Sequence, residues 1–315
     1  MTYFWETVDT IAPGLGWPHF GPFHLAVLAV FLLLGAVLCR GYCGMDSRIR
    51  AARAALHMWE EPCISGKKGS GAVFFSGCGL RCCFCQNRDI AIGDSGKEIS
   101  VERLAEIFLE LQEKGAANLN LVTGAHYVPH IISALELARG KEMNLPVVYN
   151  SSGYESVETI RRLDGYVDVY LPDMKYMEPE LAAAFSNARD YPQAAQSAIA
   201  EMMRQTGPCQ FAEDGYIKRG TIVRHLILPG HTKNSIAVLK YLYRTYGEDI
   251  FISVMNQYTP VWKNEKFPEL NRKVTRREYE KVLDAAIELG IENGYFQEGE
   301  TAEESFIPAF DYEGV

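Results

Sequence analysis

Charged residues are absent from one long stretch near the start of this 315-residue chain. Between Asp9 and Arg40 there is no Asp, Glu, Lys or Arg, and within this gap residues 23–39 are almost wholly apolar. At about 1.5 Å per residue in a helix, such a segment is at the short end of what spans a bilayer. It also lacks the polar face of a soluble surface helix. The segment therefore predicts a transmembrane helix that anchors the chain.

The residues around this segment indicate its orientation. A cleavable signal peptide starts with a basic region, whereas Glu6 and Asp9 precede the apolar run. Basic residues follow it, and the positive-inside rule places the part after them in the cytoplasm. These residues are Arg40, Arg48, Arg50 and Arg53. Residues 1–40 are either a genuine anchor or a foreign segment joined from another reading frame.

The chain also lacks a basic excess and has few cysteines. Its 31 Lys and Arg against 40 Asp and Glu give a net charge of −9, which argues against nucleic-acid binding through phosphate contacts. Eight cysteines in a chain of this length make a disulfide framework a poor explanation. The next cysteine after Cys85 is Cys209, so no second closely spaced pair completes a closed zinc site.

Three of the cysteines that are present lie at C-x3-C-x2-C spacing, at Cys78, Cys82 and Cys85. One short loop can carry all three, and three thiolates can bind three irons of a cubane [4Fe–4S] cluster, which usually takes four cysteines. A cluster held only by these three has one open iron, which indicates chemistry at that iron and not electron storage. Zinc is the main alternative, and the adjacent Cys83 permits another register.

After residue 70 short apolar runs alternate with amphipathic stretches, which is typical of βα units around a parallel sheet. Six units are predicted, with strands at residues 72–78, 118–123, 146–150, 167–171, 221–228 and 250–255. Their helices are predicted at residues 101–114, 128–138, 156–163, 179–185, 193–205, 234–246 and 276–289. This pattern indicates an α/β fold and leaves two architectures open, a partial (β/α)6 TIM-like barrel and a doubly wound sheet.

With Phe84 as its aromatic residue, the cysteine motif C-x3-C-x-aromatic-C resembles the signature of radical S-adenosylmethionine (SAM) enzymes. Longer strings are similar to the branch related to pyruvate formate-lyase activating enzymes. They lie at residues 59–66, 69–78, 120–129, 169–175 and 222–230. The resemblance implies a partial (β/α)6 barrel over residues 71–315, preceded by a lead-in segment at 41–70. Residues 1–40 lie outside the resemblance.

The resemblance also implies cofactors, a reaction and partners. The cofactors would be a [4Fe–4S] cluster on Cys78, Cys82 and Cys85 and a SAM molecule on the open iron. Reductive cleavage of SAM would give methionine and a 5′-deoxyadenosyl radical, which would activate a glycyl radical enzyme. A flavodoxin or ferredoxin would donate the electron. The alternative is a membrane-tethered iron–sulfur or zinc-binding protein without SAM turnover.

A reducible cluster and exposed thiolates need a reducing compartment. We therefore expect the catalytic part in the cytoplasm, anchored to the inner face of the cell membrane through residues 23–39.

The active site of such a barrel lies at the C-terminal ends of its strands. Cys78 closes the first predicted strand, and Asp173 and Lys175 follow the fourth. The end of the second strand is where the resemblance implies a motif for the amino group of SAM. The predicted cofactor-binding residues are Phe84, Thr123, Gly124, Asn150, Ser152, Arg224 and Asn256.

Overall fold

The computed structural model describes residues 45–93, 95–296, 308 and 310–315. The chain divides into the units Met1–Gly41 and Tyr42–Val315, and all described residues belong to the second. The predicted membrane anchor at residues 23–39 therefore lies outside the described residues. Within the described part, no helix combines the length and apolar character needed to cross a membrane.

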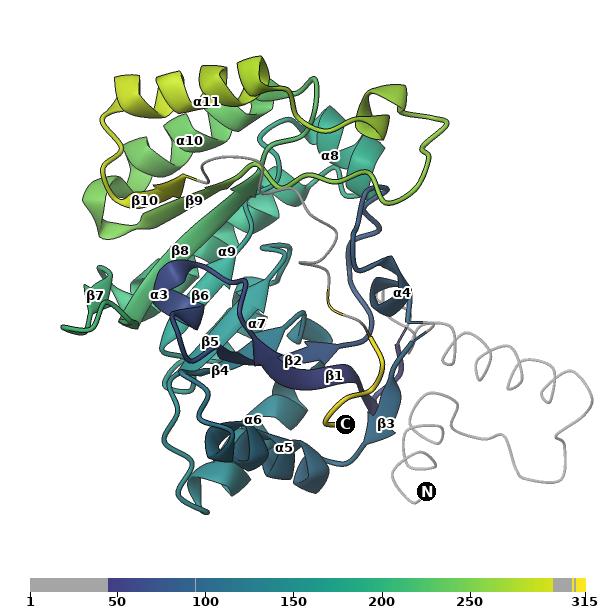
Figure 1. The fold of residues 1–315 in the computed structure, drawn as a ribbon, viewed down its shortest axis with the longest axis vertical. Helices are drawn as coiled ribbons and strands as arrows, with labels where there is room; N and C mark the ends of the chain where they lie inside the picture. The colour runs from purple at the N-terminus through teal and green to yellow at the C-terminus, as the bar shows by residue number, and fades with distance from the viewer. Residues whose placement is uncertain (1–44, 94, 297–307, 309) are drawn as a thin grey trace, which may run out of the picture. The chain divides into compact units, whose positions relative to one another are not determined.

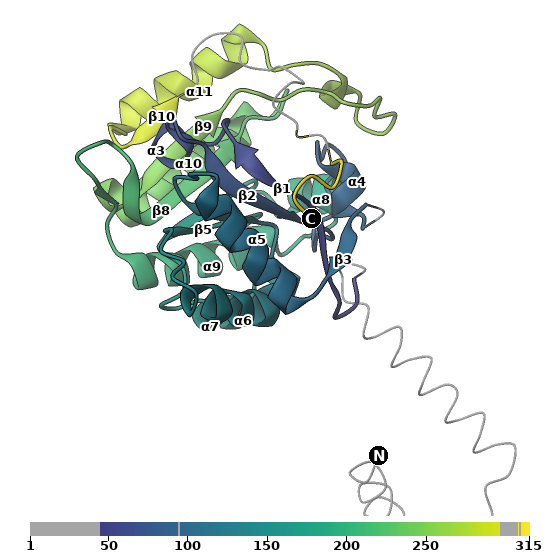
Figure 2. The same ribbon diagram turned by 60° about the horizontal axis from the view of Figure 1, so that its bottom comes forward.

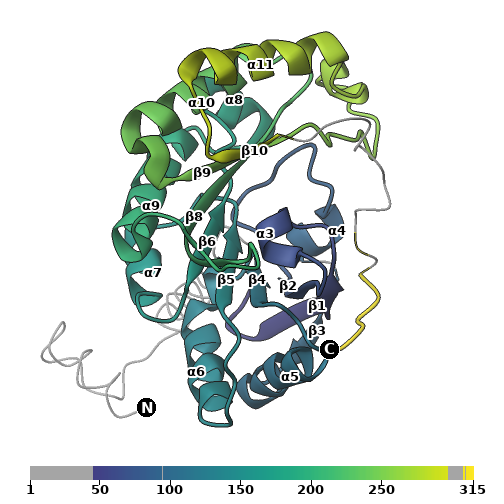
Figure 3. The ribbon, with the colours of Figure 1, turned by 60° about the vertical axis from the view of Figure 1, so that its left-hand side comes forward.

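A mostly parallel sheet forms the centre of the unit Tyr42–Val315. Its ten described strands run in the order β10-β9-β8-β6-β5-β4-β2-β1-β3, with β7 beside β8 (Figures 1 and 3). The parallel strands are β2 (Ser70–Phe75), β4 (Leu119–Val122), β5 (Val147–Ser151), β6 (Val169–Pro172), β8 (Ile217–Leu226), β9 (Phe251–Met255) and β10 (Gly294–Phe296). The antiparallel strands are β1 (Ile49–His57), β3 (Lys97–Ile99) and β7 (Gln210–Phe211).

Helices follow the parallel strands and lie outside the curved sheet (Figure 2). Two short helices, α3 (Pro62–Ser65) and α4 (Arg88–Ala91), flank β2 in the sequence. The longer ones are α5 (Val101–Glu113), α6 (Val128–Arg139), α7 (Val157–Arg162), α8 (Pro179–Ser186), α9 (Tyr191–Thr206), α10 (Thr232–Tyr246) and α11 (Arg276–Leu289).

Helix α5 illustrates why these segments become helical. The Ser100 side chain caps its start by accepting a hydrogen bond from the Arg103 backbone N–H. The apolar residues of the helix are spaced three and four apart, so they form one buried stripe against the sheet. They are Leu104, Ile107, Phe108 and Leu111.

The strand order decides between the two architectures that the sequence leaves open. From β2 through β4, β5, β6 and β8 to β9, each new parallel strand is added on the same side of the preceding one. A doubly wound sheet reverses direction at a switch point, and this order does not. The six predicted βα units and the α/β class are confirmed. The sheet is open, with β3 and β10 as its two outermost described strands.

The sheet differs from the sequence prediction at the end of β2 and in four strands that the sequence does not predict, β1, β3, β7 and β10. Strand β2 ends at Phe75, so Cys78 lies in the following loop and does not close the strand as predicted. Strand β1 was not predicted, because its sequence IRAARAALH is rich in Ala and Arg, which have low β propensity. It forms because small residues on its buried positions pair antiparallel with β2 along Ala51–His57.

Candidate functional site

The three motif cysteines lie in the loop between β2 and α4. Cys78, Cys82 and Cys85 all line one cavity of about 150 Å³. The other walls of this cavity come from the ends of β4, β5, β6 and β8, which is the edge of the sheet where parallel strands present their functional residues. The structure therefore brings together the motif and the strand ends that the sequence predicts as one site.

Phe84 anchors this loop. It is buried and packs edge to face against Phe185, at 6.4 Å between ring centroids, and against Tyr258, at 6.2 Å. The backbone N–H of the next-door residue Cys83 donates to the Phe185 carbonyl oxygen at 2.7 Å. These contacts fix the loop against α8 before any cofactor binds.

Burial keeps the motif thiols neutral in the absence of a bound metal. It raises the pKa of Cys78 to about 11 and that of Cys85 to about 12, and the neighbouring cysteines add to both shifts. Because thiolate is the form that binds metal, the cavity needs a positively charged iron centre to stabilise three thiolates at neutral pH.

A cubane cluster and a single zinc ion need different arrangements of cysteine ligands. A zinc ion needs its sulfur ligands on one point, each about 2.3 Å from the metal. Among the residues that the structure describes, no three His, Cys, Asp or Glu side chains converge in this way. A cubane cluster binds each cysteine at a different iron, so its ligands surround a volume and do not meet at a point. The three thiols around one cavity fit this second arrangement.

Cys83 lies apart from this cavity. It borders a different recess, together with Trp262 and Asn264. The Trp262 indole N–H donates to the Cys83 carbonyl oxygen at 3.0 Å, which holds the backbone of the loop on that side. The register that uses Cys78, Cys82 and Cys85 is therefore the one that fits the inner cavity.

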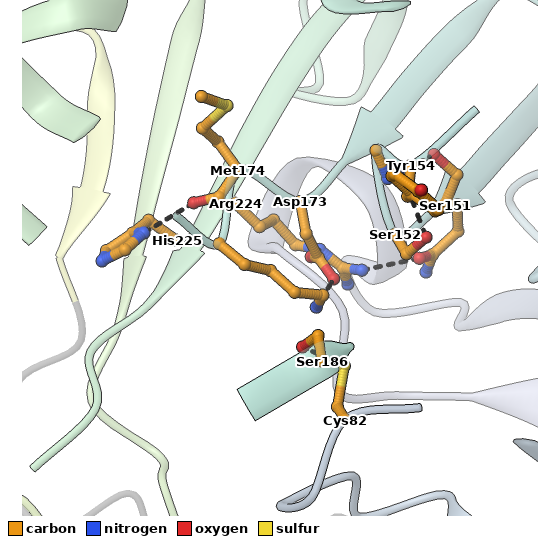
Figure 4. A network of polar contacts seen from close by, with 12 residues as sticks. Cys82, Ser151, Ser152, Tyr154, Asp173, Met174, Ser186, Arg224 and His225 are labelled. Carbon is orange, nitrogen blue, oxygen red and sulfur yellow. Dashed lines mark hydrogen bonds and ion pairs between the residues drawn. The ribbon is translucent and has the colours of Figure 1, made fainter. Parts of the chain in front are cut away.

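A hydroxyl group contacts one of the three sulfurs. Ser186, the last residue of α8, donates a hydrogen bond from Oγ to Cys82 Sγ at 2.9 Å (Figure 4). The Tyr176 hydroxyl lies 2.7 Å from the same Ser186 Oγ. Since the Ser186 proton is directed to the sulfur, Tyr176 is the donor in this second bond. Both residues are buried, so the pair forms a fixed chain that ends on Cys82.

Arg224 on β8 is the centre of a charged network on the other side of the cavity. Its Nε donates to Asp173 Oδ1 at 3.1 Å, its Nη1 to Glu60 Oε2 at 3.1 Å, and its Nη2 to Asn150 Oδ1 at 2.6 Å (Figure 4). The strand register explains this convergence, because Asp173 and Arg224 form a parallel bridge just beyond β6. The Glu60 carboxylate is also bound by the Asn150 amide at 3.0 Å.

Arg224, Asp173 and Lys175 keep their charges despite burial. Burial opposes the charge of Arg224, but the Asp173 and Glu60 carboxylates outweigh it and raise the pKa of Arg224. Burial likewise opposes ionisation of Asp173, yet Lys175 and Arg224 hold the pKa of that carboxyl below its usual value. Asp173 raises the pKa of Lys175 against the effect of burial. The wall of the inner cavity therefore carries two cations, Arg224 and Lys175, beside the Asp173 carboxylate.

The predicted cofactor-binding residues divide into two groups. Five of them line the cavities at the cysteine loop: Thr123, Asn150, Ser152 and Arg224 in the inner one, and Phe84 in an adjoining cavity of about 230 Å³. The other two are not among the lining residues. Gly124 packs against Ile131 and Phe75, and the neighbours of Asn256, Met255 and Gln257, border the adjoining cavity.

Thr123 has an unusual backbone. Its φ of 61° is in the left-handed region, which is uncommon for residues other than glycine and costly for a β-branched one. Its N–H donates to the Asn150 carbonyl oxygen at 2.9 Å, which ties the end of β4 to β5. The strain occurs where β4 ends on the cavity, which is consistent with a functional constraint at this position.

Some residues of the site were missed by the sequence prediction. Glu60 lies in the segment predicted only as a lead-in, and its signal was its place in the string at residues 59–66. Asp173 and Lys175 were noticed at a strand end but not singled out, although two opposite charges two residues apart on one strand were a usable signal. Ser186 gave no signal, because its contact with Cys82 joins residues 104 positions apart.

The comparison with protein families agrees with this geometry. Residues 72–242, more than half of the chain, match the family model described as the radical SAM superfamily. The chain belongs to the radical SAM superfamily. Enzymes of this superfamily use a [4Fe–4S] cluster and SAM.

The individual proteins that resemble this radical SAM protein share less than 30% of their aligned residues with it. An uncharacterized protein of Methanocaldococcus jannaschii is 29% identical over 254 residues, which are 78% of this chain and 69% of that protein. The pyruvate formate-lyase-activating enzyme of Clostridium pasteurianum is 26% identical over 113 residues, 34% of this chain and 46% of that enzyme. The structure of Streptococcus suis SuiB bound to S-adenosylmethionine aligns with a TM-score of 0.46 and 13% identity, over 70% of this chain and 48% of that one. This chain thus spans less than half the length of the last two.

Because of Glu155, the stability of the radical SAM protein is predicted to depend on pH. Burial raises the pKa of this carboxyl from 4.5 to about 7, although the Ser151 and Tyr149 hydroxyls act in the opposite direction. The folded chain therefore binds more protons than the unfolded chain between these two pH values, and stability falls as pH rises through them. Relative to Glu155→Gln, the wild type is expected to lose about 3 kcal/mol of unfolding free energy across this range.

Urea unfolding of both proteins at several pH values measures this difference. Glu288→Gln, a substitution of an exposed glutamate on α11, serves as the control and should follow the wild type. If the unfolding free energies of the wild type and Glu155→Gln changed with pH in the same way, the prediction would be contradicted.

Proposed function

We propose that this protein is a radical SAM enzyme that binds its [4Fe–4S] cluster through Cys78, Cys82 and Cys85, reductively cleaves SAM, and activates a glycyl radical enzyme. The observation that carries the proposal is the position of the three half-buried motif thiols on one cavity, opposite a wall of paired charges. Three cysteines leave one iron of a cubane cluster without a protein ligand. When bound, the reduced cluster supplies the electron that cleaves SAM into methionine and a 5′-deoxyadenosyl radical.

The charged wall suits the functional groups of SAM. The SAM carboxylate would be matched by Lys175 and Arg224, and the SAM ammonium and ribose hydroxyls by Asp173. Asn150, Thr123 and Ser152 add neutral hydrogen-bonding groups on the same cavity. Because these groups already hold one another in place, they would receive SAM with little rearrangement.

Cleavage of SAM is the direct test of this function. The protein is reconstituted anaerobically with iron and sulfide, reduced with dithionite and incubated with SAM. Equal amounts of methionine and 5′-deoxyadenosine are expected. About one zinc per chain with no acid-labile sulfide, and no product, would support the alternative of a metal-binding protein without SAM turnover.

Support for a protein substrate comes from the rim of the adjoining cavity. Trp59 is 59% exposed and lines the cavity that also reaches Cys82 and Cys85, and its neighbours in the chain Leu56 and Met58 are 36% and 44% exposed. Exposed apolar residues at the mouth of a site are typical of a surface that receives another protein. The similarity to the activating enzyme of Clostridium pasteurianum points to the same kind of substrate.

The activase role has its own test. The reduced protein and SAM are mixed with glycyl radical enzymes encoded by the same organism, and glycyl radicals are followed by electron paramagnetic resonance (EPR). Radical formation on one of them would identify the partner. SAM cleavage without radical formation on any of them would contradict the activase role and leave the radical SAM chemistry intact. We place this activity in the cytoplasm, where reductants can reach the cluster.

The Ser186 hydroxyl should tune the cluster. A hydrogen bond to a cysteine ligand stabilises the reduced cluster, which carries one more negative charge, and so raises the reduction potential. Ser186→Ala is expected to lower the midpoint potential, on the order of tens of millivolts, with unchanged iron content. Tyr176→Phe, which removes only the second bond of the chain, should give a smaller shift in the same direction.

A redox titration followed by EPR measures both shifts. Ser197→Ala, an exposed serine on α9, is the matched control. Equal potentials in the wild type, Ser186→Ala and Ser197→Ala would show that the hydroxyl contact has no effect on the cluster.

A further inference from the structure

The cysteine loop separates the inner cavity from a second recess. This recess has a volume of about 460 Å³, and Cys82 and Cys85 lie on its wall as they do on the wall of the inner cavity. Apart from residues within the segment 80–91, no residue that the structure describes lines both the recess and either of the two cavities described above. The loop is therefore a thin partition with an opening on each side.

Basic residues surround the second recess. Arg81, Arg88, Lys263 and Lys266, here named the basic collar, are all exposed and line it, whereas Glu265 is the one acidic residue among the described residues of its lining. The chain as a whole has 31 basic and 40 acidic residues and a net charge of −9. A local excess of positive charge on an acidic protein creates a field that attracts an acidic partner to that place.

An aromatic residue connects this surface to the cysteine loop. The Arg88 guanidinium lies 5.4 Å from the centroid of the Trp262 ring, and the Trp262 indole N–H is bonded to the Cys83 carbonyl oxygen at 3.0 Å. Trp262 is thus in the recess and in direct contact with the peptide next to Cys82. Any redox group that docks against Trp262 comes within a few bonds of the cysteine loop.

We infer that the basic collar is the docking site of the electron donor, a small acidic flavoprotein of the flavodoxin type. The inference rests on the proposed function. Charge complementarity brings the acidic carrier to the collar, and the apolar edge of its flavin ring packs against the aromatic floor at Trp262. The flavin hydroquinone loses one electron and the cluster gains it. No bond of this protein is formed or broken, and any proton released by the flavin passes to solvent.

Because the two openings are separate, the electron donor can bind while SAM and the substrate are already in place. A carrier on the collar leaves the inner cavity accessible, because the described residues that line both the cavity and the recess all belong to the loop segment 80–91. SAM and a protein substrate can then remain bound while the electron arrives. The radical is formed only once its target is in place, which limits its loss to side reactions.

Charge reversal on the collar tests the inference. Lys263→Glu/Lys266→Glu changes two exposed loop residues that are outside the cavity of the proposed SAM site. Lys240→Glu/Lys281→Glu, at exposed positions on α10 and α11, makes the same change of charge elsewhere and is the matched control. Formation of 5′-deoxyadenosine is measured with each protein, using dithionite, a purified acidic flavodoxin in its hydroquinone form, or a reduced ferredoxin.

At low salt the collar variant is expected to lose about ten- to hundredfold of its flavodoxin-driven kcat/KM, an effect that high salt reduces. Its dithionite-driven rate and both rates of the control variant should equal those of the wild type. A flavodoxin-driven rate within about twofold of the wild type would overturn the inference, as would a defect only with ferredoxin. A wild type that forms no product with dithionite would instead refute the proposed function.

Discussion

Cys78→Ala, Cys82→Ala and Cys85→Ala are each expected to lose most of the iron and sulfide that the wild type takes up on anaerobic reconstitution, together with all SAM cleavage. Each thiol would hold a different iron, so a cluster left with two protein ligands is exposed to loss of its iron. The three sulfurs line one cavity, and no other cysteine of the described residues is on its wall to replace a missing ligand. Iron and acid-labile sulfide analysis of the reconstituted proteins measures the effect.

Cys83→Ala is the matched control for this series. Cys83 is adjacent in sequence to Cys82 but borders the second recess and not the inner cavity. The Cys83→Ala protein should therefore take up as much iron and sulfide as the wild type and cleave SAM at the same rate. A loss in Cys83→Ala as large as that in Cys82→Ala would mean that the cluster uses the other register of the motif.

Arg224→Met is expected to cost about 3–5 kcal/mol of unfolding free energy, because it leaves the buried Glu60 and Asp173 carboxylates without their shared cation. The side chains of Arg224 and Glu60 are only 15% and 8% exposed, so solvent cannot replace the lost interactions. The same substitution removes a cation from the proposed SAM site. Urea unfolding of the apoprotein gives the stability, and equilibrium dialysis against labelled SAM gives the binding.

Two further variants separate the effect of the buried charges on stability from the effect of Arg224 on SAM binding. Arg276→Met removes a surface arginine whose side chain is 91% exposed and pairs with Glu280, and it should change stability by less than about 1 kcal/mol. The triple variant Arg224→Met/Glu60→Gln/Asp173→Asn removes the unpaired charges and should recover part of the stability, but not SAM binding. A stability of Arg224→Met equal to that of Arg276→Met would contradict the role of the buried network.

The parts of the fold and site that the sequence predicted are those with local patterns. The motif cysteines lie within eight residues of each other, and each of the six βα units has its own apolar periodicity, so both could be recognised without knowledge of contacts. Arg224 and Asn150 were predicted because they are polar residues near the ends of apolar strands. The membrane anchor at residues 23–39 stays a prediction.

The parts that were missed depend on long-range packing. Strand β1 has no alternating apolar pattern and is stabilised by its pairing with β2 and β3. Glu60 becomes part of the site only because β1 brings it to Arg224, 164 residues away in the sequence. Ser186 reaches Cys82 because α8 packs on the cysteine loop. No local pattern encodes such contacts, since they arise from the order of the strands.

The most direct test of the central claim is the EPR spectrum of the reduced, reconstituted protein before and after addition of SAM. If three cysteines hold the cluster and leave one iron open, SAM binds that iron and changes the spectrum in both the wild type and Cys83→Ala. An unchanged spectrum, from protein that holds about four irons and four sulfides per chain, would contradict the account, because it would mean that no iron is open to SAM.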